Sequence, residues 1–396
     1  MKTINDFNFK NLKVLIRVDF NVPLNDKFEI QSTNRIDAAL PSIKKILNDG
    51  GSVILMSHLG RPKDAPEEKF SLKHVVDYIA NQLGIQVQFA DDCIGESAKE
   101  LSERLKPGEV LLLENLRFHK EEKKGDEEFA KKLASLGDFY VNDAFGTAHR
   151  AHASTAVMAK YFDKEHKAFG LLMAKEVTAM EQVLNNSQKP FTAILGGAKV
   201  SDKIPVIENL LNKVDNLIIG GGMMFTFVKA MGGSIGNSLC EDEHLETTRN
   251  ILQKAKDLKV NLYIPEDAII ADKFENNANI ELVNSNQIPE GWLGLDIGNL
   301  SKMKIGDIIL NSKTILWNGP VGVFEMDNFA EGTKYVAKTV AQATSKGAYS
   351  LIGGGDTVSA LKKFGYTNDV SYVSTGGGAM LEYIEGKMLP GVEALL

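Results

Sequence analysis

Short apolar runs alternate with amphipathic stretches along the whole chain, and this alternation predicts the fold class. The runs are rich in Val, Ile and Leu, and each ends at Gly, Asn, Asp, His or Pro. Continuous apolar runs of this length are typical of strands buried on both faces of a parallel sheet. The predicted strands are residues 13–19, 52–58, 109–115, 139–143, 191–196, 216–221, 261–265, 314–319, 349–353 and 371–376.

Helical periodicity fills several of the gaps between these strands. The predicted helices include residues 72–83, 127–136 and 205–214, the last with Ser201 or Asp202 as its N-cap. Strands alternating with helices predict an α/β fold with parallel sheets and helices on both sides, three layers in all. About ten strands are too many for one compact sheet, so we expect two sheets.

The seam between the two halves is expected between residues 155 and 190. No Gly/Ser/Pro-rich linker lies there. Residues 171–184 instead repeat apolar side chains at helical spacing, with Met173, Val177, Met180 and Leu184 on one face. A helical connector predicts a semi-rigid joint between two domains.

Composition and charge narrow the class of protein. The 396 residues carry a net charge of −7, and an acidic chain is a poor non-specific binder of nucleic acid. Cys93 and Cys240 lie far apart, which excludes a disulfide framework and a zinc ribbon. The first ten residues are polar, unlike a signal peptide, and no run of about 18 apolar residues occurs. We therefore expect a cytoplasmic protein without a membrane span.

Glycine clusters distinguish the second half of the chain. They follow predicted strands at residues 196–197, 220–222, 353–355 and 376–378. A glycine turn that opens a helix exposes backbone N–H groups, where the helix dipole favours phosphate. Lys199 and Lys203 follow the first cluster and suit a phosphoryl group, while Asp356 and Thr357 follow the third. The Asp356 carboxylate suits Mg²⁺ beside phosphate oxygens. Tight turns, solvated lysines and N-capping by Asp356 remain the alternatives at this point.

The first half places charged side chains at its strand ends instead. Only seven of the 45 cationic residues are Arg, and six of these precede residue 151. The carboxyl ends of parallel strands share one sheet edge, so we expect Arg35, His58, Arg61, Arg117 and Arg150 to converge there. Several guanidinium groups at one edge suit a small anion that carries carboxylate and phosphate groups.

Common catalytic signatures are missing or wrongly placed. No GxxxxGK[ST] occurs and no GxGxxG follows a strand, which disfavours a P-loop enzyme and a dinucleotide-dependent dehydrogenase. A GxSxG pattern at residues 232–236 follows a helix-like stretch, so a helix C-cap and loop are favoured over a nucleophile elbow. His149 and His152 lack a third metal ligand of suitable spacing, which favours phosphate contact or a structural role. The two halves together have the layout of a two-substrate phosphotransferase.

The motifs at the strand ends resemble those of the phosphoglycerate kinase family, in the same order. They are RVDFNVP at 17–23, SHLGRP at 57–62, ENLRF at 114–118, NDAFGTAHRAHAS at 142–154, GGAKVSDK at 196–203, LWNGPVGVFE at 316–325, GGGDT at 353–357 and STGGGAMLEYIEGKMLPG at 374–391. The resemblance implies two Rossmann-like domains joined by a long helix. Residues 1–170 would bind phosphoglycerate, 171–185 would connect the domains, 186–375 would bind nucleotide, and 376–396 would pack back onto the N-terminal domain.

The resemblance also implies a reaction and its site residues. The reaction is reversible phosphoryl transfer between 1,3-bisphosphoglycerate and ADP, giving 3-phosphoglycerate and MgATP in glycolysis, with hinge closure of a monomer. By motif position the phosphoglycerate ligands would be Asp19, Asn21, Arg35, His58, Leu59, Gly60, Arg61, Arg117 and Arg150. The nucleotide ligands would be Lys199, Lys203, Gly294, Glu325, Gly354, Gly355, Asp356 and Thr357, with Mg²⁺ on Asp356. Arg35 and Lys199 would contact the transferring phosphoryl group.

Two other function classes stay open on the sequence. One is a nucleotide-sugar or dinucleotide enzyme on a similar double scaffold, which the absence of GxGxxG disfavours. The other is a non-catalytic nucleotide- and anion-binding protein, which would not need Arg35, Lys199 and Asp356 together. Turnover of the two substrates separates both from the kinase.

Overall fold

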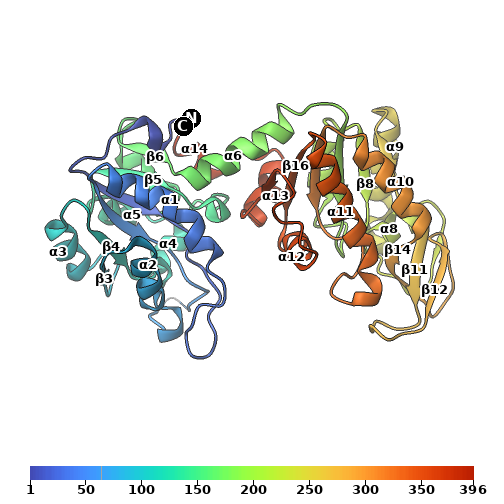
Figure 1. The fold of residues 1–396 in the computed structure, drawn as a ribbon, viewed down its shortest axis with the longest axis horizontal. Helices are drawn as coiled ribbons and strands as arrows, with labels where there is room; N and C mark the ends of the chain where they lie inside the picture. The colour runs from blue at the N-terminus through green and yellow to red at the C-terminus, as the bar shows by residue number, and fades with distance from the viewer. Residues whose placement is uncertain (64) are drawn as a thin grey trace. The chain divides into compact units, whose positions relative to one another are not determined.

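The computed structural model describes residues 1–63 and 65–396, and these divide into two compact units. Unit 1 comprises Met1–Thr178 and Met388–Leu396, and unit 2 comprises Ala179–Lys387. The boundary between them falls inside helix α6, Leu171–Leu184, which has the bounds expected for the connecting helix (Figure 1).

The units differ from the expected domains at the returning C-terminal segment. Residues 376–387 were expected to pack on the N-terminal domain, but they belong to unit 2. The reason is helix α13, Gly378–Ile384, which packs on α7, Ile204–Leu210, where Asn209 Nδ2 donates to the Ile384 carbonyl at 2.6 Å. Only 388–396 returns to unit 1, where the Gly391 N–H donates to the Ala148 carbonyl at 2.8 Å.

Unit 1 is an α/β unit around one six-stranded sheet with the order β3-β4-β2-β1-β5-β6. Every pair of neighbouring strands is parallel. The strands are β1 Lys13–Arg17, β2 Ser52–Met56, β3 Val87–Ala90, β4 Val110–Leu113, β5 Phe139–Asn142 and β6 Lys167–Phe169. The helices are α1 Asn34–Asn48, α2 Val76–Leu83, α3 Glu96–Arg104, α4 Lys120–Lys124, α5 Glu127–Ala134 and α14 Pro390–Glu393, with 3-10 turns η1 Ile4–Asp6, η2 Glu68–Phe70, η3 Leu72–Val75, η4 Leu116–Phe118, η5 Phe145–Thr147 and η6 Val157–Tyr161.

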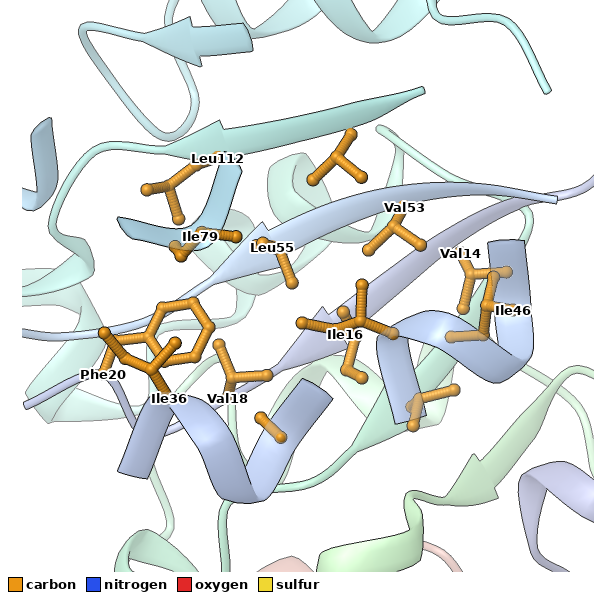
Figure 2. Packing of buried hydrophobic residues seen from close by; sticks show 14 of the residues in the cluster. Val14, Ile16, Val18, Phe20, Ile36, Ile46, Val53, Leu55, Ile79 and Leu112 are labelled. Carbon is orange, nitrogen blue, oxygen red and sulfur yellow. The ribbon is translucent and has the colours of Figure 1, made fainter. Parts of the chain in front are cut away.

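Both faces of this sheet are buried, as the continuous apolar runs predict. Val14 and Ile16 of β1 lie in one cluster with Ile36 and Ile46 of α1 (Figure 2). Successive strand residues point to opposite faces, so Leu15 lies on the other side, and it is also fully buried. Helices must therefore cover both faces, which gives the expected three layers.

Unit 2 contains a second six-stranded parallel sheet, with the order β10-β8-β7-β15-β16-β17. Its strands are β7 Phe191–Leu195, β8 Asn216–Ile219, β10 Asn261–Tyr263, β15 Thr314–Asn318, β16 Tyr349–Gly353 and β17 Tyr372–Val373. Its other helices are α8 Met224–Ala230, α9 Leu245–Asp257, α10 Asn299–Leu310, α11 Glu331–Ser345 and α12 Gly355–Lys363, with 3-10 turns η7 Asp242–His244 and η8 Asp327–Phe329.

Two small sheets in unit 2 have no counterpart in the sequence prediction. An antiparallel sheet has the order β12-β11-β14, with β11 Asp267–Ala271, β12 Ile280–Asn284 and β14 Leu293–Ile297. A parallel pair joins β9 Ser234–Ile235 to β13 Gln287–Ile288. Strand β12 is largely exposed, so it lacks the apolar run that identified the parallel strands.

Two predicted helix starts are corrected by the structure. Neither Ser201 nor Asp202 is the N-cap of α7: the N-cap is Lys203, without a side-chain cap hydrogen bond, and Pro205 occupies the first turn. The predicted helix at 72–83 begins with the 3-10 turn η3, where the Ser71 side chain accepts from the Lys73 N–H. The 3-10 turn η3 uses a tighter hydrogen-bond pattern than apolar periodicity alone indicates.

Candidate functional site

The polar residues predicted in unit 1 gather at the carboxyl edge of its sheet. Asp19 and Asn21 follow β1, His58 follows β2, and Arg117 follows β4, while Arg35 lies in the first turn of α1. The strand order reverses at β1, which is flanked by β2 on one side and by β5 on the other. Ligands of open α/β sheets bind at such a reversal, outside the carboxyl ends of the strands.

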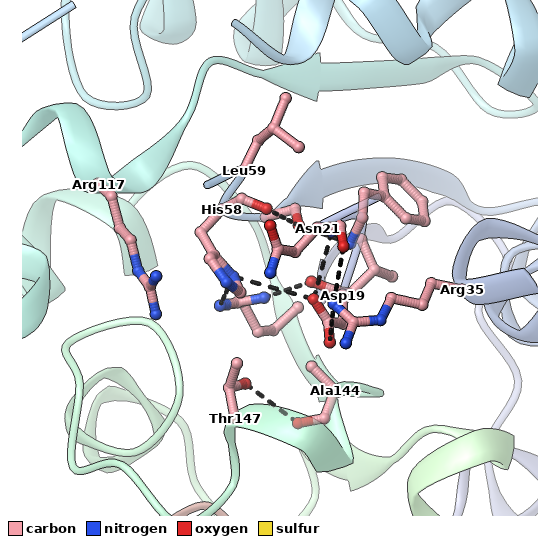
Figure 3. A network of polar contacts seen from close by, with 12 residues as sticks. Asp19, Asn21, Arg35, His58, Leu59, Arg117, Ala144 and Thr147 are labelled. Carbon is pink, nitrogen blue, oxygen red and sulfur yellow. Dashed lines mark hydrogen bonds and ion pairs between the residues drawn. The ribbon is translucent and has the colours of Figure 1, made fainter. Parts of the chain in front are cut away.

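Asp19, Asn21 and Arg35 form one hydrogen-bonded group at this edge (Figure 3). The Arg35 guanidinium Nη1 donates to the Asn21 carbonyl at 2.7 Å and lies 3.4 Å from Asp19 Oδ2. The Asn21 side chain in turn accepts from the Gly60 N–H at 2.8 Å. Gly60 has φ +63°, and a Cβ there would lie 2.3 Å from the Phe70 ring, so the close approach requires glycine. Leu59, its neighbour, is buried, and its carbonyl accepts from Asn115.

His58 is a buried, neutral hydrogen-bond donor. Its pKa lies well below the usual 6.5, because burial and the charges of Arg17, Arg117 and Arg35 disfavour the imidazolium. Arg17 Nη2 lies 3.3 Å from His58 Nδ1. A guanidinium can only donate, so Nδ1 is the acceptor and the ring proton is on Nε2. His58 thus offers an N–H group to an anion without adding a charge.

Three further arginines leave donors available at this edge. Arg117 Nη1 donates to the Gly60 carbonyl at 3.0 Å, but its buried Nε has no hydrogen-bond partner. Burial, aided by Arg17 and opposed by Glu122, lowers the Arg117 pKa to about 10. Arg61 and Arg150 are exposed, and their side chains make no hydrogen bond or ion pair within the described part of the chain. Anionic oxygens are the partners that such donors lack.

A buried network behind this edge was missed by the sequence analysis. Arg17 is fully buried and donates from Nε to Ser154 Oγ at 2.9 Å. Glu122, also fully buried, accepts from the Ser154 hydroxyl at 2.5 Å and from its N–H at 2.9 Å. His152 Nδ1 lies 4.0 Å from Glu122, and burial lowers the His152 pKa to about 4. These groups hold Arg17 against His58. Glu122 sits in the charged run KEEKK, where nothing in the sequence separates it from its exposed neighbours.

The main cavity of unit 2, about 700 Å³ in volume, is lined by its glycine turns and by the small antiparallel sheet. Gly197 and Gly221 come from the turns after β7 and β8, and Gly294 from β14. The turns approach closely: a Cβ on Gly196 would lie 2.1 Å from the Pro320 carbonyl oxygen. The cavity thus lies where β7 meets β15, which is the point where the strand order of this sheet reverses.

Gly294 shapes one wall of this cavity. A Cβ at Gly294 would lie 2.1 Å from Cζ of Phe225, which also lines the cavity. The Gly294 N–H donates to Ser238 Oγ at 2.8 Å, which ties β14 to the segment that carries Leu239. Apolar walls with few polar groups are typical of a site for a planar ring such as a nucleotide base. The sequence analysis placed Gly294 here but missed Phe225 and Leu239.

Lys203 and Thr357 each bond to one of two consecutive residues at the carboxyl end of β15, Asn318 and Gly319. Lys203 is buried and donates from Nζ to Asn318 Oδ1, while Asn318 Nδ2 donates to the Gly353 carbonyl at 3.0 Å. Burial lowers the Lys203 pKa, against the opposing charges of Asp202 and Asp356. The fully buried Thr357 hydroxyl accepts from the Gly319 N–H at 2.7 Å. Asn318 was not predicted, although it belongs to the LWNGP motif.

Asp356 is free to hold a metal ion. The alternative of N-capping fails, because Gly354 is the N-cap of α12 and Asp356 lies in its first turn without capping it. Its exposed carboxylate lines the cavity and has no hydrogen bond in the described residues. One carboxylate beside ligand phosphates is the donor set that Mg²⁺ uses, so the residues fit the ion. Lys199 and Glu325 are both exposed, and Glu325 also lines the cavity. The space beside Gly355 is open, because a Cβ there would meet no atom within 4 Å.

The GxSxG pattern carries no nucleophile. Ser234 is an exposed residue of β9, which follows helix α8 and Gly232 at φ +92°. No helix in the described residues is long and apolar enough to cross a bilayer.

Comparison with known proteins identifies the family. A family model described as phosphoglycerate kinase matches residues 4–387. A phosphoglycerate kinase from Porphyromonas gingivalis is 54% identical, covering 99% of each chain. The chain belongs to the phosphoglycerate kinase family. A cytosolic phosphoglycerate kinase from Nicotiana tabacum is 51% identical over 99% of this chain and 97% of the relative.

Solved structures of phosphoglycerate kinases share this fold. That from Coxiella burnetii has a TM-score of 0.92 at 42% identity, covering 99% of this chain and 98% of the other. That from Pyrococcus horikoshii has a TM-score of 0.81 at 31% identity, covering 100% and 98%. The chain is therefore a phosphotransferase of this family, which transfers phosphate between 1,3-bisphosphoglycerate and ADP with Mg²⁺. The dinucleotide enzyme and the non-catalytic binding protein are not supported.

Proposed function

We propose that unit 1 of this phosphoglycerate kinase binds the phosphoglycerate and unit 2 binds the nucleotide. The observation that supports this assignment is the difference between the two sheet edges. Unit 1 offers guanidinium groups at Arg61, Arg117 and Arg150 that form no ion pair within the described residues. Unit 2 offers a glycine-lined apolar cavity with Asp356 and Glu325 at its margin. The first suits a small, highly charged acid, and the second a nucleotide base with Mg²⁺-bound phosphates.

Within unit 1, Asp19, Asn21, Arg35, His58, Arg61, Arg117 and Arg150 hold 3-phosphoglycerate, together with the backbone at Leu59 and Gly60. Within unit 2, Gly294 contacts the base, Glu325 the ribose, and Lys203 and the Gly354–Thr357 turn the phosphates. Asp356 holds Mg²⁺, which offsets the charge of the nucleotide phosphates when bound.

The chemistry requires positioning and charge neutralisation rather than a general base. The nucleophile is the carboxylate of 3-phosphoglycerate, which is ionised at neutral pH because such a group has a pKa near ~4. Its oxygen forms a bond to the γ-phosphorus of ATP, the bond from that phosphorus to the bridging oxygen breaks, and ADP leaves with the electron pair. Arg35 and Lys199 neutralise the charge of the phosphoryl group during transfer.

Because the substrates occupy different units, transfer requires the units to bring them together and to exclude water. Helix α6 and the segment near residues 374–376 are the proposed hinges. Small-angle scattering should record compaction when both ligands bind. The same scattering profiles give the molecular mass, and we expect that of a monomer. We also expect the protein to function in the cytoplasm.

Turnover tests the assignment directly. Purified protein is mixed with 3-phosphoglycerate and MgATP, and the acyl phosphate is trapped with hydroxylamine. We expect product that depends on Mg²⁺ and forms far more slowly, though still measurably, in Lys199→Ala. If calorimetry detected binding of both ligands without product, the chain would be a binding protein on this scaffold. Product at the wild-type rate from Lys199→Ala would reject the role given to that lysine.

A further inference from the structure

The loop that carries Lys199 is anchored by a carboxylate from another segment of unit 2. Ser201 lies two residues after Lys199, between β7 and α7. Its N–H donates to Glu241 Oε2 at 3.0 Å, and its hydroxyl donates to Glu241 Oε1 at 2.7 Å. Both carboxylate oxygens of Glu241 therefore accept a hydrogen bond from Ser201.

The anchored state of Glu241 is the charged one. Burial alone would raise the pKa of the Glu241 carboxyl, but hydrogen bonds from the Ser201 hydroxyl and N–H and from the Val200 backbone hold it below its usual value. Charge-assisted hydrogen bonds of this kind are about twice as strong as neutral ones. The Glu241 backbone is itself fixed, since its N–H donates to the buried Thr226 hydroxyl of α8 at 3.2 Å.

The segment that carries Glu241 also forms a wall of the nucleotide cavity. Asn237 and Leu239 line that cavity, and Ser238 Oγ accepts a hydrogen bond from the N–H of Gly294, which also lines it. Residues 237–241 therefore contact the base pocket at one end and the lysine loop at the other. Lys199 itself is exposed, and its side chain makes no hydrogen bond or ion pair within the described residues.

We propose that Glu241 is a positioning residue, which fixes the backbone of the Lys199 loop through Ser201. This inference rests on the proposed role of Lys199 in phosphoryl transfer. Glu241 touches no substrate in this scheme, so its whole effect on the reaction passes through Lys199. A small displacement of a side chain that must contact the reacting phosphoryl group lowers the rate strongly. Fixing the loop that carries Lys199 should therefore affect kcat.

Steady-state kinetics of a double-mutant cycle test the proposal. Glu241→Ala should lower kcat with MgATP about tenfold, the scale of coupling within one hydrogen-bond network, and leave the KM for 3-phosphoglycerate unchanged. In a Lys199→Ala background the same change should lower kcat less than twofold, because the group that it positions is gone. Glu241→Gln keeps one acceptor for the Ser201 N–H and should recover part of the loss.

Glu266→Ala is the matched control in the same unit. Glu266 is an exposed carboxylate that pairs with Lys304 at 2.5 Å, away from the nucleotide cavity, and its removal should leave kcat within twofold of wild type. Thermal unfolding of each variant shows that it is folded, and Glu241→Gln replaces Glu241→Ala if the latter is not.

The outcomes separate the two hypotheses. Equal losses from Glu241→Ala in both backgrounds, or no loss in the wild-type background, would overturn the positioning role. If Lys199→Ala alone kept full kcat, the proposed function of Lys199 would fail instead, whatever the Glu241 variants did.

Discussion

Gly294→Ala should weaken nucleotide binding by a purely steric route. The added Cβ would lie 2.1 Å from Phe225 Cζ and 2.8 Å from Cε1 and Cε2. Carbon atoms rest about 3.5–4.0 Å apart, so the ring would have to move by roughly 1.5 Å. Gly294 is not in the left-handed region, so alanine strains no backbone angle there. The cost is therefore confined to repacking Phe225.

The expected magnitude follows from overpacking. Inserting a methyl group into a well-packed site costs about 1–3 kcal/mol. Phe225 is only 3% exposed and lines the cavity, so the open direction for its ring is into the cavity proposed to bind nucleotide. If this overpacking free energy destabilises only the nucleotide-bound state, the Kd for MgADP rises about 5- to 150-fold, since 1.4 kcal/mol corresponds to about a tenfold change in Kd.

Calorimetric titration of MgADP and of 3-phosphoglycerate measures the effect, with urea unfolding beside it. The Kd for 3-phosphoglycerate should not change. Phe225→Leu has a shorter side chain, so the double variant Phe225→Leu/Gly294→Ala should bind MgADP more tightly than Gly294→Ala alone. The reasoning is refuted if Gly294→Ala leaves both the MgADP Kd and the unfolding free energy at their wild-type values.

Three further predictions concern other parts of the site. Arg35→Lys keeps the charge but loses the planar fork, and kcat should fall roughly 10²-fold or more, the scale of one lost transition-state donor; a near wild-type kcat would contradict the assignment. Asp356→Ala should raise the Mg²⁺ concentration needed for half-maximal rate, and an unchanged Mg²⁺ titration would reject its role. Asp143 is fully buried, and its carboxylate accepts a hydrogen bond from the Met173 N–H at 3.1 Å. Burial raises the pKa of this carboxyl from 3.8 to about 6. The folded state therefore binds a proton on Asp143 more tightly than the unfolded state does. The stabilisation that comes from this protonation is lost as the pH rises from about 4 to 6. In urea titrations, the free energy of unfolding of Asp143→Asn should rise relative to that of the wild type over this pH range. A difference between the two proteins that does not change with pH would contradict the prediction.

Much of the parallel architecture was predictable because strands buried on both faces leave a continuous apolar signal. The strand at residues 13–19 is observed as Lys13–Arg17, and that at 314–319 as Thr314–Asn318. The exposed strand Ile280–Asn284 has no such signal, and it forms through antiparallel pairing with β11. Such a strand is stabilised by pairing with its neighbour, and local apolar periodicity does not show that pairing.

The candidate site followed the same division. Strand-end residues such as His58 and Asp356 could be identified because topology sends all carboxyl ends of a parallel sheet to one edge. Glu122 could not, because its burial depends on a loop that returns Ser154 to α4. Glu241 was equally hidden, since its partner Ser201 lies forty residues away in the sequence.

The two units offer anions physically different environments, and the difference suits the ligands proposed for them. Unit 1 uses side-chain charge held out of water: Arg17 is fully buried, and the Arg117 pKa is lowered to about 10 by that desolvation. A bound anion would reverse this cost, because an opposite charge favours the guanidinium form. Another cation at this edge would repel the arginines. Burial keeps His58 neutral, so its Nε2–H can donate a hydrogen bond without adding a positive charge. In the proposed assignment, unit 2 instead offers backbone N–H groups at glycine turns, whose positive potential does not titrate. A compact acid with two charged ends needs the concentrated field of the first kind. A nucleotide, whose charge is shared with Mg²⁺ and whose base needs an apolar wall, is better served by the second.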